Sequence, residues 1–175
     1  GMMAVERILL SISIGEEDRT SVLNVLHIIF RRCFPLMCAV SLILVLSAVP
    51  LTRMFYRDPS DPIYSMTVMG FRLLPLCMPL AVISLAFACY AQAAQKKTMS
   101  VVLPVIDGFV GVSVCSLFLI PLMKMNGLYI ANILNGVICL IVIILFAWKD
   151  CGHFPKSVED LAAIPADFGA READR

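Results

Sequence analysis

One apolar stretch, residues 99–123, constrains the fold of this chain more than any other, because it carries a single charge, Asp107. The stretch is long enough to cross a hydrocarbon core of about 30 Å, which needs roughly 20 helical residues. Asp107 lies about 12 Å from one end of such a helix, at about 1.5 Å per residue. A carboxylate at that depth costs at least about 2.5 kcal/mol. We therefore expect Asp107 to face protein or water rather than lipid.

The positions of the other apolar blocks predict an all-α polytopic membrane helix bundle. Of the 175 residues, 60% are hydrophobic and 15% are charged, whereas a soluble domain averages about 25% charged residues. We predict a transmembrane bundle over residues 1–149 and a polar cytoplasmic tail or linker over residues 150–175, with a short helix after Ser157. The bundle has four full spans, at residues 33–51, 63–94, 99–123 and 128–148.

The segment before the first span is too short to cross a membrane. Residues 8–14 are apolar, but an acidic turn follows where a signal peptide would carry small residues for cleavage. We interpret this run as an N-terminal half-helix stub, the last two turns of a helix whose start lies outside the sequence, ended by Gly15. Residues 20–32 are amphipathic, which predicts an interfacial approach to the first span.

The second span is longer than a bilayer requires and contains Pro75 and Pro79. Each proline removes a backbone donor and clashes with the preceding turn, so the pair predicts a helix kink. Alternatively, the carbonyl groups freed by the prolines line a polar cavity.

The candidate site is built from the few polar residues inside the spans. Arg72 is the basic residue deep within a span, and its depth is similar to that of Asp107 on the next, antiparallel helix. The two side chains are therefore able to pair and fix the helix register. Alternatively, Asp107 exchanges a proton or cation or meets a charged substrate, or it faces a water-filled cavity without a dedicated role. Asn132 and Asn135 complete this polar lining or form interhelical hydrogen bonds.

Several classes of site are not expected. The seven cysteines form no C-x-x-C pair and the two histidines have no ligand-spaced partner, so we predict packing cysteines and no metal site. No nucleophile has a positioned base and no glycine loop suits phosphate, so an enzyme is not predicted. The chain also lacks a basic patch with interleaved aromatic residues, which argues against nucleic-acid binding.

Charge near the span ends predicts the orientation. Four spans place both ends on one side, where six lysines and arginines lie near the spans, against three on the opposite side. The six are Arg19, Arg31, Arg32, Lys96, Lys97 and Lys149, and the three are Arg53, Arg57 and Lys124. Because basic residues favour the cytoplasmic side, we expect a multi-pass protein of the plasma (inner) membrane with both termini in the cytoplasm.

The order of five short stretches resembles the C-terminal part of a multidrug and toxic compound extrusion (MATE) transporter. The resemblance spans nearly the whole chain up to Trp148. The stretches are Ile12-Ser-Ile-Gly-Glu-Glu-Asp, Leu51-Thr-Arg-Met-Phe-Tyr, Gly70-Phe-Arg-Leu-Leu-Pro, Tyr90-Ala-Gln-Ala with Lys97-Thr-Met-Ser, and Asn126-Gly-Leu-Tyr-Ile-Ala. Glu16 and Glu17 depart from the family, which commonly has small residues there. Asp107 stands where the family often has other residues, so its role rests on the physical argument.

This resemblance implies a partial lobe of a twelve-helix transporter that exports cationic or amphipathic compounds in exchange for Na⁺ or H⁺. The implied partners are the lipid bilayer, a small cationic substrate and the remaining transporter helices. Two alternatives stay open. One is a lipid-linked oligosaccharide flippase of related fold, although Arg72 is a single deep basic residue where a flippase should have several. The other is a non-transporting membrane anchor for a cytoplasmic domain.

Overall fold

The computed structural model describes residues 2–16, 18–56 and 62–162, and the regular elements in these ranges are all helical. Two π-helical turns (η1 and η3) and one 3₁₀ turn (η2) interrupt the α-helices. The elements are α1 (Met2–Gly15), α2 (Arg19–Ile28), η1 (Ile29–Cys33), α3 (Phe34–Leu46), α4 (Ala48–Phe55), α5 (Pro62–Leu73), η2 (Leu74–Cys77), α6 (Met78–Ala93), α7 (Lys97–Val105), η3 (Ile106–Val110), α8 (Gly111–Met123), α9 (Met125–Cys151) and α10 (Val158–Ala162).

Within the described residues, four helices are long and apolar enough to cross a membrane: Arg19–Leu46, Pro62–Ala93, Lys97–Met123 and Met125–Cys151. The all-α fold with four membrane-length helices is therefore as the sequence predicts. The first of these helices is longer than the predicted span, because the amphipathic residues 20–32 form its beginning. The Asp18 carboxylate caps it by accepting hydrogen bonds from the Thr20 and Ser21 backbone N–H groups, which helix starts otherwise leave unpaired.

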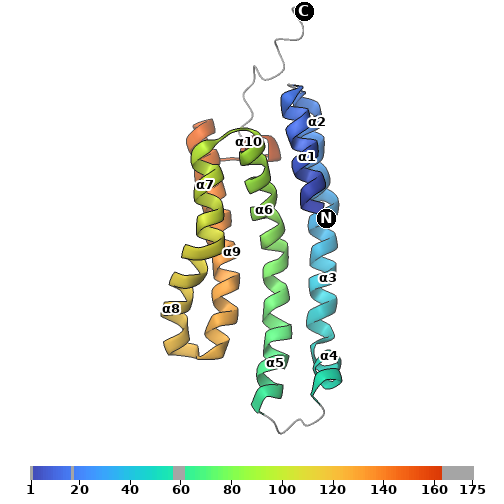
Figure 1. Cartoon of the computed structure of the whole chain (residues 1–175), viewed down its shortest axis with the longest axis vertical. Coiled ribbons are helices and arrows are strands. Elements are labelled where there is room, and N and C mark those ends of the chain that lie inside the picture. Colours follow the sequence, from blue (N-terminus) through green and yellow to red (C-terminus); the bar gives the residue numbers. More distant parts are fainter. Residues whose placement is uncertain (1, 17, 57–61, 163–175) are drawn as a thin grey trace, which may run out of the picture.

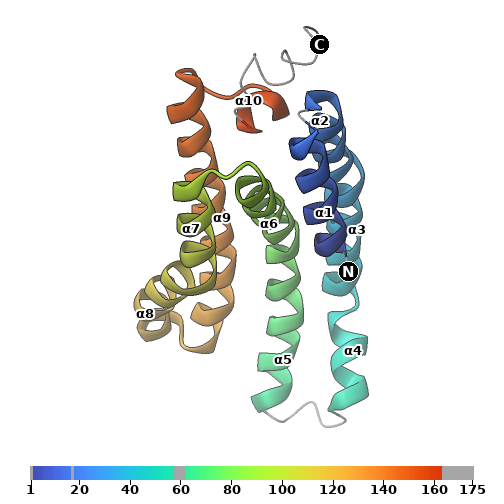
Figure 2. The ribbon, with the colours of Figure 1, turned by 45° about the horizontal axis from the view of Figure 1, so that its top comes forward.

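The helices form three columns around α6 (Figures 1 and 2). One column is the long helix α2–η1–α3, with α1 packed beside its upper part. The central column is α5–η2–α6, and the third is the hairpin of α7–η3–α8 with α9. The short α10, which follows Ser157, lies over the end of the bundle where α1 and α2 meet. The turn between α1 and α2 and the helix α10 thus lie toward the same end of the bundle.

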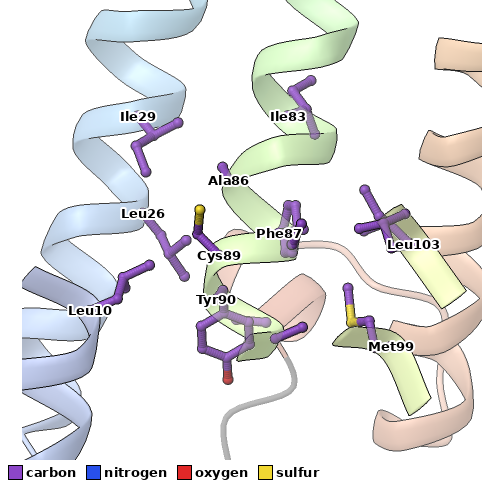
Figure 3. Close-up of a cluster of buried hydrophobic side chains, with 14 of the residues drawn as sticks. Leu10, Leu26, Ile29, Ile83, Ala86, Phe87, Cys89, Tyr90, Met99 and Leu103 are labelled. Carbon is purple, nitrogen blue, oxygen red and sulfur yellow. The ribbon is translucent and has the colours of Figure 1, made fainter. Parts of the chain in front are cut away.

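The hydrophobic core gathers on the second half of α6. Figure 3 shows side chains from both outer columns meeting this helix: Leu10 and Leu26 lie toward Cys89, and Leu103 lies beside Phe87. Phe87, Leu10 and Leu26 are completely buried. Phe30 packs edge-on against Phe87 with ring centroids 6.0 Å apart, a favourable aromatic geometry. This end of the bundle is the most tightly closed part of the molecule.

The outer faces of α3 and α8 are apolar and exposed. Leu46, Leu117 and Leu122 are 74%, 75% and 81% exposed. Soluble monomers rarely expose many large apolar side chains on one face, whereas such faces suit contact with lipid or with further membrane helices. The fold is therefore that of a multi-pass helical membrane protein.

Candidate functional site

The two prolines of the second span lie at a break in its helical geometry. The 3₁₀ turn η2 contains Pro75, and Pro79 follows in the first turn of α6. Pro79 has no N–H to donate to the Pro75 carbonyl. That carbonyl instead accepts from the Met78 backbone N–H and from the hydroxyl of buried Ser41 on α3, whose Oγ lies 2.6 Å away. The carbonyl therefore holds α3 against η2.

Asp107 lies on a π-helical turn, η3, between α7 and α8. Pro104 comes just before this turn, and the widened turn closes with the Gly111 N–H donating to the Ile106 carbonyl. Proline is compatible with such a widened turn because it cannot supply the regular helical donor. Single π-turns within helices are rare and occur frequently at functional sites. The local backbone thus distinguishes the neighbourhood of Asp107 from the rest of its helix.

Asp107 is bonded to the neighbouring helix α9 through two side chains. The Asn135 amide Nδ2 donates both to the Asp107 carboxylate Oδ1 and to the Asp107 backbone carbonyl, each at 3.0 Å. The Cys139 thiol lies 3.5 Å from the same Oδ1. Asn135 is buried, with 4% of its surface exposed, while Asp107 is partly exposed. The carboxylate therefore has neutral donors on one side and stays accessible on the other.

Small residues let α8 and α9 approach closely enough for these bonds. A Cβ atom added to Gly111 would lie 1.8 Å from the Asn135 amide oxygen, and one added to Gly127 would lie 2.4 Å from the Leu119 carbonyl. Asp107, Gly111 and Leu119 are separated by multiples of four residues along η3 and α8. Their partners Cys139, Asn135 and Gly127 are separated by multiples of four residues in the opposite direction along α9. The sequence stretch Asp107, Gly111, Cys115 therefore meets the α9 face that carries Asn135 and Cys139.

The bonded carboxylate lies near the middle of the bundle. Cys139, its partner, is close to the midpoint of α9 (Met125–Cys151). At about 1.5 Å per residue, Cys139 is about 18–21 Å from each end of that helix. Buried Ser84 of α6 interacts with the same thiol. Polar groups from three membrane-length helices thus converge at the level of Asp107.

The structure does not bring Arg72 to Asp107. Arg72 is exposed on α5, and among the described residues no ion pair joins the two side chains. Gly70 packs on Tyr129 and Gly136 packs on Leu80, so Arg72 lies near the level of residue 131 of α9. That level is about 12 Å along the bundle from Cys139. The sequence predicted one depth for the two charges because depth was counted from the ends of each span. Neighbouring helices are offset along the bundle, and this offset separates Arg72 from Asp107.

Asn132 also lies apart from the carboxylate. Its amide Nδ2 donates to the Leu128 carbonyl, 3.0 Å away on its own helix. No cluster of three or more histidine, cysteine or acidic side chains suited to a metal ion occurs among the described residues. All seven cysteines lie in this part of the chain, and none is in a disulfide. The side chains of Asp107, Asn135 and Cys139 therefore form the site, together with Gly111, which permits their approach.

Two residues of the site, and the Ser41 hydroxyl that bonds to the Pro75 carbonyl, were not singled out as site residues from the sequence. Cys139 and Gly111 lay at four-residue spacings from Asn135 and Asp107, but spacing alone does not state which faces meet. The sequence shows Ser41 as a hydroxyl in an apolar span. It does not show the partner of this hydroxyl, which is the Pro75 carbonyl. Glu6, a further buried acid, lies just outside the apolar run 8–14.

No family model, curated protein or solved structure matches this chain. The fold and the site define its class, a multi-pass helical membrane protein with a carboxylate between two of its membrane-length helices.

Proposed function

We propose that this chain is part of an ion-coupled secondary transporter that exports cationic or amphipathic compounds, with Asp107 binding the coupling ion or the cation that is exported. One observation carries the proposal. The Asp107 carboxylate lies near the middle of the bundle, is bonded only to neutral donors among the described residues, and remains partly exposed. A carboxylate in a membrane without a basic partner is a functional-site hypothesis by default.

The chemistry of the site suits a proton or a monovalent cation. The Asn135 N–H donates to the Asp107 carboxylate and the Cys139 thiol lies 3.5 Å from the same oxygen, so uncharged groups fill one side of the carboxylate. The accessible side of the carboxylate then supplies oxygen for Na⁺, oxygen being the ligand that hard cations prefer, or it accepts H⁺. Binding neutralises the charge, which lowers the cost of moving this part of the bundle within the membrane.

The large exposed apolar faces of α3 and α8 support the proposal that further transporter helices join this bundle, as the MATE resemblance implies. Gly111, Cys115 and other small residues are already used between α8 and α9. The proposed assembly therefore places the remaining helices against α3 and the outer face of α8. We place the bundle in the plasma membrane with both termini in the cytoplasm.

The test is efflux of a fluorescent cation from a drug-sensitive bacterial host that expresses the protein, with membrane abundance measured by blot. We expect the wild type to export the dye and Asp107→Asn to lose export at equal abundance, because the neutral amide has no negative charge to balance a cation and cannot exchange a proton. Asn135→Ala should reduce export, since it removes the donor to Asp107. Asn132→Ala is the matched control on the same helix and should leave export unchanged.

Two results would contradict the proposal. Equal export by the wild type and Asp107→Asn would make the carboxylate a structural group. Absence of export by every variant, the wild type included, would favour the flippase or the anchor over the transporter.

A further inference from the structure

A second buried carboxylate lies at a different interface from Asp107, between α1 and α6. Glu6 is 6% exposed, and it shares the buried face of α1 with Leu10, four residues further on, and with Ser13, three residues after that. This face packs on α6, where the neighbouring thiol is that of Cys89, itself 1% exposed. Glu6 thus lies one helical turn from Leu10, whose side chain belongs to the closed core shown in Figure 3.

The carboxylate of Glu6 lacks the partners that buried charges normally have. Its Oε1 atom is buried and accepts no hydrogen bond from any described residue. Arg7, the next residue, is exposed and forms no ion pair with Glu6 among the described residues. Its side chain interacts instead with the Cys89 thiol, so one positive charge lies at the edge of this interface. On α6 the titratable group near Glu6 is Cys89. On α2, the other helix packed on α1, the exposed His27 is bonded through Nδ1 to the Leu23 carbonyl.

An unpartnered carboxylate in such a place is far more stable when it is neutral, because burial penalises the charged form. This desolvation raises the pKa of Glu6 to about 7. The group therefore gains a proton at a pH well above the ordinary range for a glutamate. Separation of α1 from α6 would return the carboxylate to water and to its ordinary acidity.

We propose that Glu6 is a proton-binding site that holds one proton while α1 is packed on α6 and releases it when the two helices separate. The proposal concerns an interface that Asp107 does not touch, and it stands whether or not the chain transports anything. It assigns to α1 the role of a movable element whose contact with α6 is linked to proton occupancy.

The sign of the pH dependence follows from proton linkage. The packed state binds the proton more tightly than the separated state, so low pH favours packing. Packing is therefore at its strongest below a pH of about 4.5, the ordinary value for Glu, and it weakens as pH rises toward about 7. Within this window, each pH unit multiplies the separated fraction by up to about tenfold.

Cys89 reports on this separation directly, because its thiol lies under α1 and is almost fully buried. The experiment measures alkylation of Cys89 by mass spectrometry on the full chain in lipid nanodiscs. Rates at about pH 5 and about pH 7 are divided by those of the unfolded chain, which removes the effect of thiol ionisation. We expect the corrected rate for the wild type to rise at least about tenfold between these pH values.

Glu6→Gln keeps the shape of the side chain but cannot release a proton, so its corrected Cys89 rate should not change with pH. Glu16→Gln is the matched control, since it makes the same chemical change at an exposed position. It should behave as the wild type. The same pH response in the wild type and in Glu6→Gln would overturn the proposal, as would a wild-type rate that does not change.

A second measurement keeps the test decisive if Glu6→Gln does not fold. Infrared spectra of the wild type with isotope-labelled glutamate should show one buried, protonated carboxyl band near pH 6 that is lost above about pH 8, given the raised pKa of Glu6. Glu16→Gln should keep this band. A wild-type spectrum without the band would mean that Glu6 is ionised when packed, and the proposal would be wrong.

Discussion

At the scale of single residues, the contact between Asp107 and Asn135 depends on the absence of a side chain at Gly111. The amide of Asn135 occupies the space that a Cβ atom at this position would need. From there the amide reaches both the carboxylate and the backbone carbonyl of Asp107. Gly111 is therefore needed because it has no side chain. Its backbone is helical, so no special backbone conformation is required there.

Gly111→Ala should separate α8 from α9 at the level of Asp107. The added methyl group would lie 1.8 Å from the Asn135 amide oxygen and 2.8 Å from the Ile106 carbonyl. Overpacking of this kind typically costs about 1–3 kcal/mol, more than the roughly 1 kcal/mol that alanine gains over glycine in a helix. We expect a lower thermal unfolding midpoint in detergent and loss of cation export.

Gly108→Ala is the matched control for this substitution, because no atom lies within 4 Å of a Cβ added there. Its midpoint should equal or exceed that of the wild type. An equal loss of stability in both variants would show that helix geometry, and not contact with Asn135, decides the effect.

At the scale of elements, the prolines explain where the membrane-length helices depart from regular α geometry. Pro35 follows the π-turn η1, Pro75 lies in the 3₁₀ turn η2, and Pro104 precedes the π-turn η3. The sequence shows that a proline interrupts the backbone hydrogen bonding. It does not show which turn type results, because this depends on what the freed carbonyl meets. At Pro75 the partner is Ser41, from another helix.

The short helix α10 is held at the end of the bundle by its buried Ala162, by the Cys151 thiol, which donates to the Asp160 carbonyl, and by Lys96. The Lys96 ammonium lies 3.0 Å from the Asp150 carboxylate, 3.0 Å from the Ala162 carbonyl and 5.6 Å from the Tyr90 ring centroid. A helix of five residues is not stable by itself. Lys96 therefore joins the ends of α6, α9 and α10, and its interactions anchor α10.

Lys96→Gln should release α10, because the amide cannot replace the ion pair or the contact with the Tyr90 ring. We expect backbone hydrogen exchange in residues 158–162 to become at least several-fold faster, while exchange in α9 stays slow. Lys97→Gln is the matched control at the exposed neighbouring position. Equal exchange rates in the two variants would contradict the proposed anchor.

At the scale of the whole molecule, the three columns leave one end of the bundle tightly packed and the outer faces of α3 and α8 apolar. The basic residues Arg19, Lys96 and Lys149 lie at the packed end, near α10. This grouping fits the cytoplasmic assignment of that end by the excess of basic residues. Arg31 and Arg32 lie about 18 Å further along the first helix, so they must extend toward the interface.

The orientation predicts which positions are labelled from outside the cell. On a background without the seven native cysteines, Lys124→Cys should react with an impermeant maleimide in intact cells, and His153→Cys should not. Both should react once the membrane is permeabilised, which controls for burial. The reverse pattern in intact cells would place both termini outside and contradict the prediction.

By itself, the sequence determined the helical class, the four membrane-length segments and the presence of one acid inside them, because hydropathy and segment length act locally along the chain. The tertiary structure decided which polar groups meet. Asp107 bonds to Asn135 and not to Arg72, because close packing at Gly111, Gly127 and Gly136 sets the offsets of α8 and α6 against α9. Glu6 is buried because α1 packs on α6. Such offsets follow from the fit of whole helix faces, which spacing along one helix does not contain.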